Sequence, residues 1–155
     1  MRATGRRFNV VIGLGLLAAL LLVMPGTAAA RSPGLWSGMD GERFAARPQA
    51  VALSLSGHAG LGRLGDGRGG ITWRSWTGAW ATGVGTLWIN DGIPSYGQGT
   101  FHRHRAIVKA WRVREGHFTR LTLRFRGGTT EWKPGKVRYT WRYELAPMGS
   151  GYAWD

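Results

Sequence analysis

The amino-acid sequence predicts an all-β fold: a single small antiparallel β-sandwich or barrel of six to seven strands after an N-terminal signal peptide. Several segments alternate apolar and polar side chains with the period of two that a half-buried strand requires. Turns rich in glycine separate these segments at short intervals. After residue 30, no segment repeats apolar side chains with the 3.6-residue period of an amphipathic helix. Short strands joined by such turns are typical of antiparallel sandwiches and small barrels.

The alternation places the individual strands. It is clearest over 137–145, where aromatic and aliphatic side chains occupy every second position. We expect the other strands at 51–56, 71–76, 80–90, 101–113 and 118–126. The segment 101–113 reads as one strand or as two joined by a bend near Arg105, and Phe118 falls out of phase, which predicts a bulge near Thr119. Residues 57–70 contain seven glycines and are expected to form a flexible loop or a wide hairpin connection.

The chain begins with the features of an export signal. Three arginines among the first seven residues precede an apolar stretch of 15 residues at 10–24, and three alanines follow at 28–30. That stretch is shorter than the roughly 20 residues that span a bilayer, so a cleaved signal is favoured over a retained anchor. We therefore divide the chain into a signal peptide (1–30), a loose N-terminal arm (31–50) and a β domain (51–155). The expected location is secreted, extracellular or associated with the cell wall, with no transmembrane span in the mature chain.

The sequence contains no cysteine, which excludes disulfides and attachment of a lipid through cysteine. Stability must therefore come from an apolar core, to which nine tryptophans can contribute. Trp88, Trp111 and Trp141 fall on apolar strand faces and are predicted to be core residues. Trp76, Trp132 and Trp154 lie off those faces or near turns. Exposed tryptophans of this kind can stack on sugar rings or insert at a membrane interface, whereas packing at the sheet edge is the alternative.

Charge gives the clearest functional indication. The formal net charge is +13, and residues 101–145 alone carry 12 Lys and Arg against three Glu, a net charge of +9. Such a field attracts polyanions. Five arginines on two strands are predicted to point away from the core and to form one basic face: Arg120, Arg124, Arg126, Arg138 and Arg142. We take these, with Trp76 and Trp132, as candidate binding residues; the alternative is a solubilising surface.

Other motifs predict no cofactor, metal or catalytic site. Residues 60–65 match G-x-G-x-x-G, but no helix pattern follows, so we interpret the match as a coincidence in a glycine-rich loop. His102 and His104 share a strand face and could ligate zinc or copper. Arginines flank the pair and no acid lies nearby in sequence, so we expect exposed histidines on a basic face instead. Asp91, His102 and Ser95 could be imagined as a triad, but Asp91 is expected to cap its own turn. The protein is accordingly predicted not to be an enzyme.

The segment INDGIPSYGQGTF (89–101) joins two expected strands. Asn90, Asp91 and Gly92 form a strong turn signal because Asn and Gly tolerate positive φ, and Pro94 fixes a second bend. We interpret the segment as a structural turn.

One stretch resembles a known group of sequences. Its motifs are W-x-x-W at Trp73 and Trp76, A-T-G-x-G-T at 81–86, N-D with P, G and F between Asn90 and Phe101, and F-T-R-L at 118–121. In this order the run 71–127 resembles small secreted actinobacterial proteins of unknown function with the pattern N-D-C-x-P-x-C-A-x-G-x-F. Both cysteines of that pattern are absent here, where Gly92 and Tyr96 stand instead. The resemblance implies an exported β domain and supplies no activity.

These features predict a secreted, non-enzymatic module whose basic face adheres to anionic cell-wall or surface polymers, or to anionic headgroups. Nucleic acid suits the same chemistry, but export makes it an unlikely partner. The alternative is a protein-interaction or inhibitor-like module that docks one exported partner through its Trp-rich strands and the 89–101 loop.

Overall fold

The computed structural model describes residues 32–38, 43–54, 58–63, 69–148 and 151–155. The predicted signal peptide lies outside the described residues. Within them the chain forms ten strands and no helix. The strands are β1 (Leu35–Trp36), β2 (Phe44–Ala45), β3 (Ala50–Ala52), β4 (Ala59–Gly62), β5 (Thr72–Trp76), β6 (Trp80–Asn90), β7 (Phe101–Arg114), β8 (His117–Gly127), β9 (Val137–Met148) and β10 (Gly151–Trp154).

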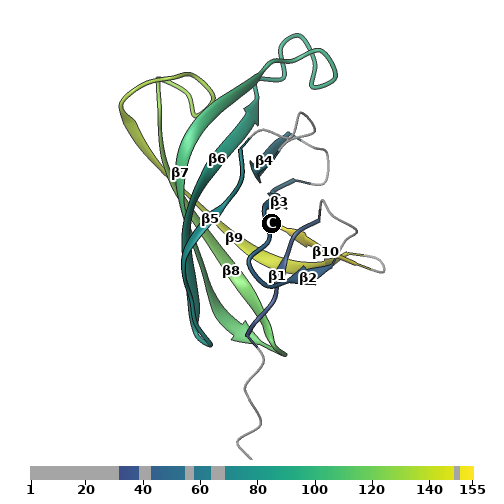
Figure 1. The fold of residues 1–155 in the computed structure, drawn as a ribbon. Helices are drawn as coiled ribbons and strands as arrows, with labels where there is room; N and C mark the ends of the chain where they lie inside the picture. Colours follow the sequence, from purple (N-terminus) through teal and green to yellow (C-terminus); the bar gives the residue numbers. More distant parts are fainter. Residues whose placement is uncertain (1–31, 39–42, 55–57, 64–68, 149–150) are drawn as a thin grey trace, which may run out of the picture.

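Eight of these strands form one antiparallel sheet in the order β10-β9-β8-β7-β6-β4-β3, with β5 also paired to β6. The sheet is strongly curved and nearly closed, and the separate two-stranded sheet β1-β2 lies within its curve (Figure 1). β4 and β5 share one edge of β6: β5 pairs with residues 81–84 and β4 with residues 87–89. The predicted all-β, antiparallel, barrel-like fold class is confirmed.

Alternation along the long strands separates the core from the outer surface. On β7, His104, Ala106, Val108 and Ala110 are buried, whereas the residues between them are exposed. On β8, the predicted inward set of Leu121, Leu123 and Phe125 is buried and Arg124 and Arg126 are exposed, as expected. The core therefore occupies the inner side of the curve, where each fully buried Leu or Phe contributes about 1.5–3 kcal/mol by leaving water.

Both ends of the described chain complete this core, which the sequence did not predict. The segment 31–50 is not loose where the structure describes it, because Leu35 and Trp36 are buried against the main sheet. Trp154 is buried as well, and its indole Nε1 donates to the carbonyl of Trp36 at 3.1 Å. Single short strands such as β1 carry too few residues to show an alternation in sequence.

The glycine-rich run 57–70 also contains a strand that the sequence did not predict. Leu61 of β4 is buried in the core, and Gly60 pairs with Trp88 of β6. At Gly62 the backbone has φ +99°, and its carbonyl accepts a hydrogen bond from the Trp88 indole at 2.8 Å. A side chain at this position would overlap the carbonyl oxygen of Gln49. Glycine is thus required at the end of this strand rather than tolerated in a loop.

Of the two readings of 101–113, the single strand is confirmed, because β7 runs without a break through Arg105. One local prediction in the long strands is wrong. The predicted bulge near Thr119 is absent, since the pairing of β7 with β8 stays in step from Trp111–Arg120 to Val113–Phe118. Both strands change phase together between Trp111–Arg120 and Val113–Phe118, where Arg112 has φ +60° and its carbonyl accepts a hydrogen bond from the Thr119 hydroxyl at 2.8 Å.

We predict that Gly62→Ala destabilises the domain strongly. The positive φ alone costs an alanine about 1–2 kcal/mol, and the overlap with Gln49 adds to that cost. Urea denaturation followed by tryptophan fluorescence measures the change. Gly78→Ala is the matched control, because a Cβ there meets nothing within 4 Å. Equal stability of the two variants would contradict the requirement for glycine at position 62.

Candidate anion-binding face

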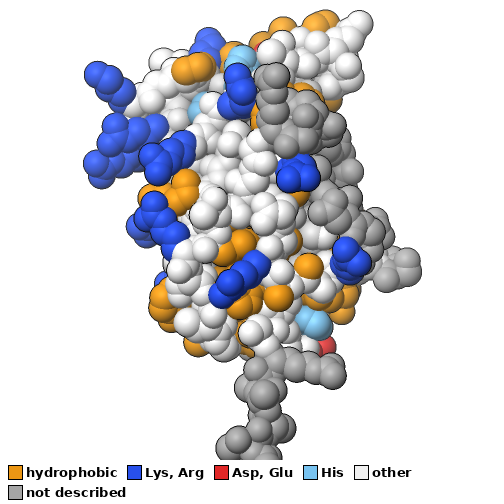
Figure 2. Space-filling view, in the orientation of Figure 1, with side chains coloured by type: hydrophobic (Ala, Val, Ile, Leu, Met, Phe, Trp, Pro, Cys, Tyr) orange, Lys and Arg blue, Asp and Glu red, His pale blue; other side chains and the backbone are white. Residues whose placement is uncertain are grey.

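The outward positions of β5, β7, β8 and β9 carry a concentration of arginine and lysine. We call this set the basic face; it consists of Arg74, Arg105, Lys109, Arg120, Arg124, Arg126, Arg138 and Arg142. In Figure 2 Lys and Arg side chains gather along the left of the molecule, and few acidic side chains are visible there. The five arginines predicted from sequence all belong to the basic face.

Strand register sets the spacing within the basic face. Arg126 of β8 lies directly opposite Arg138 of β9, and Arg124 lies opposite Thr140. Arg124 is therefore diagonal to both Arg138 and Arg142. Side chains directly opposite on neighbouring strands have Cβ atoms about 4.5–5.5 Å apart, and like charges in such pairs repel each other. The arrangement costs the isolated protein free energy.

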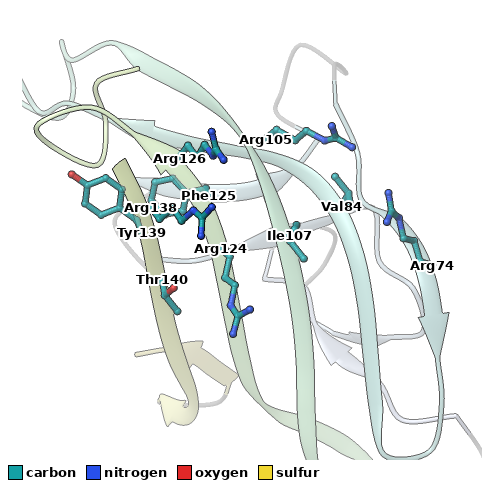
Figure 3. A pocket seen from close by; sticks show the side chains of 10 residues that line it. All are labelled: Arg74, Val84, Arg105, Ile107, Arg124, Phe125, Arg126, Arg138, Tyr139 and Thr140. Carbon is teal, nitrogen blue, oxygen red and sulfur yellow. The ribbon is translucent and has the colours of Figure 1, made fainter. Parts of the chain in front are cut away.

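The basic face is hollowed near its centre. A depression of about 860 Å³ is lined by Arg74, Arg105, Arg124, Arg126 and Arg138, with Val84 and Ile107 providing apolar surface between them (Figure 3). Ile107 is 57% exposed and lies between Val84 and Arg124 in the strand register. The depression thus presents an apolar floor surrounded by guanidinium groups from four strands.

Among the described residues, no carboxylate pairs with the arginines of the depression. Within the described residues there are two ion pairs, Arg120–Glu144 at 2.6 Å and His102–Asp91 at 3.0 Å. Arg120 is therefore partly neutralised, in contrast to the five arginines that line the depression. A guanidinium group offers a planar fork of N–H donors that fits phosphate or carboxylate oxygens. The depression therefore has the chemistry of a candidate anion site.

Two of its arginines were not among the sequence candidates. The position of Arg74 depends on a bulge in β5. The register shifts between Trp73 and Ser75, and Arg74 between them is left without a strand partner. Bulges re-aim a side chain, and period-two reasoning does not detect them. Arg105 follows the alternation of β7, and this outward phase is the signal that could have identified it.

The two candidate tryptophans lie elsewhere. Trp76 packs against the core, and its indole donates to the carbonyl of Pro33 at 3.1 Å. Trp132 also packs against the core, with the Lys133 ammonium 4.9 Å from its ring centroid. Neither residue lines the depression. Trp111, predicted as core, instead lies on the outer face and is 39% exposed, because it shares the phase of Arg105 and Lys109 along β7.

The loop after β6 is a hydrogen-bonded turn, in agreement with its interpretation from sequence. The Asn90 side chain accepts from the Gly92 amide at 2.8 Å and donates to the Tyr96 carbonyl at 3.0 Å. Gly92 has φ +67°, and a Cβ there would approach the Tyr96 ring to 2.8 Å. The two residues that stand at the cysteine positions of the resembling sequences are thus in close contact.

Asp91 ties this loop to β7. One carboxylate oxygen accepts from the amides of Ile93 at 3.1 Å and Thr100 at 2.9 Å, and the other lies 3.0 Å from His102 Nε2. The hydrogen bond with His102, followed by those from the two amides, lowers the pKa of Asp91 below its ordinary value of 3.8. Ser95 bonds to Gln98 and makes no contact with His102, so the geometry contains no triad.

His104 is buried, contrary to the expectation of an exposed side chain. Its ring nitrogens lie 3.0 Å from the carbonyl oxygen of Arg126 and 3.2 Å from that of Trp132. The residue therefore joins β7 to the end of β8 and to the segment that follows β8.

No protein-family model, curated protein or solved structure matches this chain. In the part of the chain that the structure describes, no three His, Asp or Glu side chains gather as metal ligands. The same residues contain no helix long and apolar enough to cross a membrane.

We predict that Asp91→Asn destabilises the domain at pH 5 and has a smaller effect at pH 3. The folded-state pKa of Asp91 is lowered, so its contribution is present above the unfolded-state pKa and is lost as pH falls through the folded value. The Asp91→Asn variant lacks this carboxylate at every pH, so the difference in stability between the two proteins becomes smaller as the pH falls. Thermal unfolding at the two pH values measures the difference, and a deficit that stays constant with pH would contradict this role.

Proposed function

We propose that the protein is a secreted, non-enzymatic binding module that adheres to an anionic polymer or surface through its basic face. The observation that carries the proposal is the depression lined by five arginines, none of which pairs with a carboxylate in the described part of the chain. Like charges held together in this way repel, and an anionic ligand removes the repulsion while it gains charge-assisted hydrogen bonds. A structure that only needed solubility would gain more from interspersed charges of both signs.

A secreted location would limit the polyanions that the protein meets. The proposal takes the secreted location from the sequence features of residues 1–30 and from the resemblance to secreted actinobacterial proteins. Anionic cell-wall or surface polymers are then the abundant partners, and anionic headgroups are a second source of the same chemistry. The non-enzymatic part of the proposal rests on the Asp91–His102 pair, which holds a loop and has no nucleophile beside it.

A protein-docking role is a second candidate, favoured by the loop rather than by the tryptophans. Trp73 and Trp76 pack against the core and are therefore not available for docking. The loop after β6, however, exposes Ile93 (59%) and Tyr96 (55%). Such a partner would bind in a salt-resistant manner, unlike a polyanion.

The first test is co-sedimentation of the purified protein with bacterial cell walls at low and at near-molar salt. At 1 M ionic strength the Debye length is about 3 Å, so attraction between exposed charges is largely screened. We expect binding at low salt and release at high salt. Absence of binding at low salt would overturn the cell-wall proposal, and binding that survives near-molar salt would favour protein docking.

We predict that Arg126→Glu weakens binding about tenfold or more at low salt and at the same time stabilises the fold. Binding falls because one guanidinium is replaced by a repelling carboxylate. Stability rises by about 0.2–1 kcal/mol, since a like-charge pair with Arg138 becomes an opposite-charge pair. Sedimentation and thermal unfolding measure the two effects.

Arg43→Glu is the matched control, with the same change in net charge at an exposed residue just before β2, off the basic face. Equal loss of binding in the two variants would show that net charge, and not the basic face, determines adhesion.

A further inference from the structure

The basic face carries a second feature that charge alone does not explain. Trp80 of β6 and Trp111 of β7 lie directly opposite each other on the outer side of the sheet. They are 41% and 39% exposed. Both belong to the same face as Val84, Ile107 and Lys109, with which they share the outward phase of their strands. Two large aromatic side chains side by side on an outer sheet face form an apolar platform that the fold does not use.

The platform is held in place from one side. The Trp111 indole Nε1 donates to the Thr122 hydroxyl of β8 at 3.2 Å, which ties the ring edge to the neighbouring strand. An indole held against the sheet loses little conformational freedom when a ligand packs on it, which favours binding.

The platform and the depression form one continuous track. Along β7, Trp111 lies four positions after Ile107 of the depression, a distance of about 13 Å at the usual strand rise. Between them the register aligns Thr82, Lys109, Thr122 and Arg142 in one transverse row. A ligand that leaves the arginine-lined depression thus crosses hydroxyl and cationic groups before it reaches the aromatic platform.

We infer that the ligand of this track is an acidic polysaccharide. This inference rests on the proposed binding of polyanions and names their class. Acidic groups of the polymer lie in the depression, and a sugar ring packs its apolar C–H face on Trp80 and Trp111. Hydroxyls of the intervening sugars find partners in the row of Thr82, Lys109, Thr122 and Arg142. The separation of the two ends requires an oligomer rather than a single sugar.

The shape of the surface disfavours a membrane as the partner. A bilayer presents a plane of headgroups, whereas the arginines surround a depression that a chain can enter. The Trp111 indole is also tied to the sheet rather than projected from it, unlike an aromatic side chain that inserts between headgroups. Single-stranded nucleic acid combines charge with flat rings as well, and it therefore enters the test as a competitor.

The test compares two carboxylate polymers that differ in the presence of sugar rings. Polygalacturonate carries one carboxylate on each sugar ring, and poly-L-glutamate carries one on each residue without rings. We expect the protein to bind both at low salt, with polygalacturonate bound more tightly. The double variant Trp80→Ala/Trp111→Ala should bind polygalacturonate about tenfold more weakly and poly-L-glutamate unchanged. Arg126→Glu should weaken binding to both.

Controls separate the platform from the fold. Ile93→Ala removes an exposed apolar side chain from the loop between β6 and β7, which is not part of the track. It should change the affinity for neither polymer. Trp111→Phe keeps an aromatic ring without the indole N–H and should retain most of the binding to polygalacturonate. Thermal unfolding of each variant confirms that it is folded.

Each remaining outcome is decisive. Equal loss of binding to both polymers in the double variant, or no loss, would overturn the sugar platform while leaving the proposed function intact. Tighter binding of single-stranded DNA or of anionic phospholipid vesicles than of polygalacturonate would also overturn it. Failure of the unmodified protein to bind either polymer would refute the proposed function itself.

Discussion

Antiparallel pairing of β6, β7, β8 and β9 forces alternate side chains onto opposite faces of the sheet, and both the core and the basic face depend on this alternation. On β8, Leu123 and Phe125 point inward while Arg124 and Arg126 point outward. A slip of one residue would exchange the two sets and bury unpaired charges, at a cost of several kcal/mol each. The apolar residues that stabilise the fold therefore also determine where the arginines lie.

The two charged clusters of the structure differ in whether their charged groups are already paired within the protein. Around Asp91, the carboxylate is satisfied by two backbone amides and by His102, so the cluster is complete within the chain. In the depression, neighbouring guanidinium groups have no described carboxylate beside them, and Glu144 reaches only Arg120. Under the proposed function, these guanidinium groups remain able to pair with an anionic ligand, whereas the Asp91 cluster is already satisfied.

Sequence periodicity predicted the fold class and five members of the basic face, because alternation is a local property of each strand. It could not predict Arg74, whose position depends on a bulge in β5. Trp111 was assigned to the core on its apolar character, although its phase matches Arg105 and Lys109. Trp76 was taken as a surface candidate, but its burial depends on Pro33, 43 residues away. Strand β4 was hidden because glycine carries no side chain from which to read a face.

The hydrogen bond from Trp154 to Trp36 joins residues 118 positions apart and closes the core between β10 and β1. Neither indole can be buried until nearly all of the intervening chain has been supplied. Under the proposed export, a chain threaded unfolded through a narrow secretion channel would lack this closure until Trp154 had emerged. The earlier strands would then reach their final packing only after passage, and pairings between such distant residues form slowly.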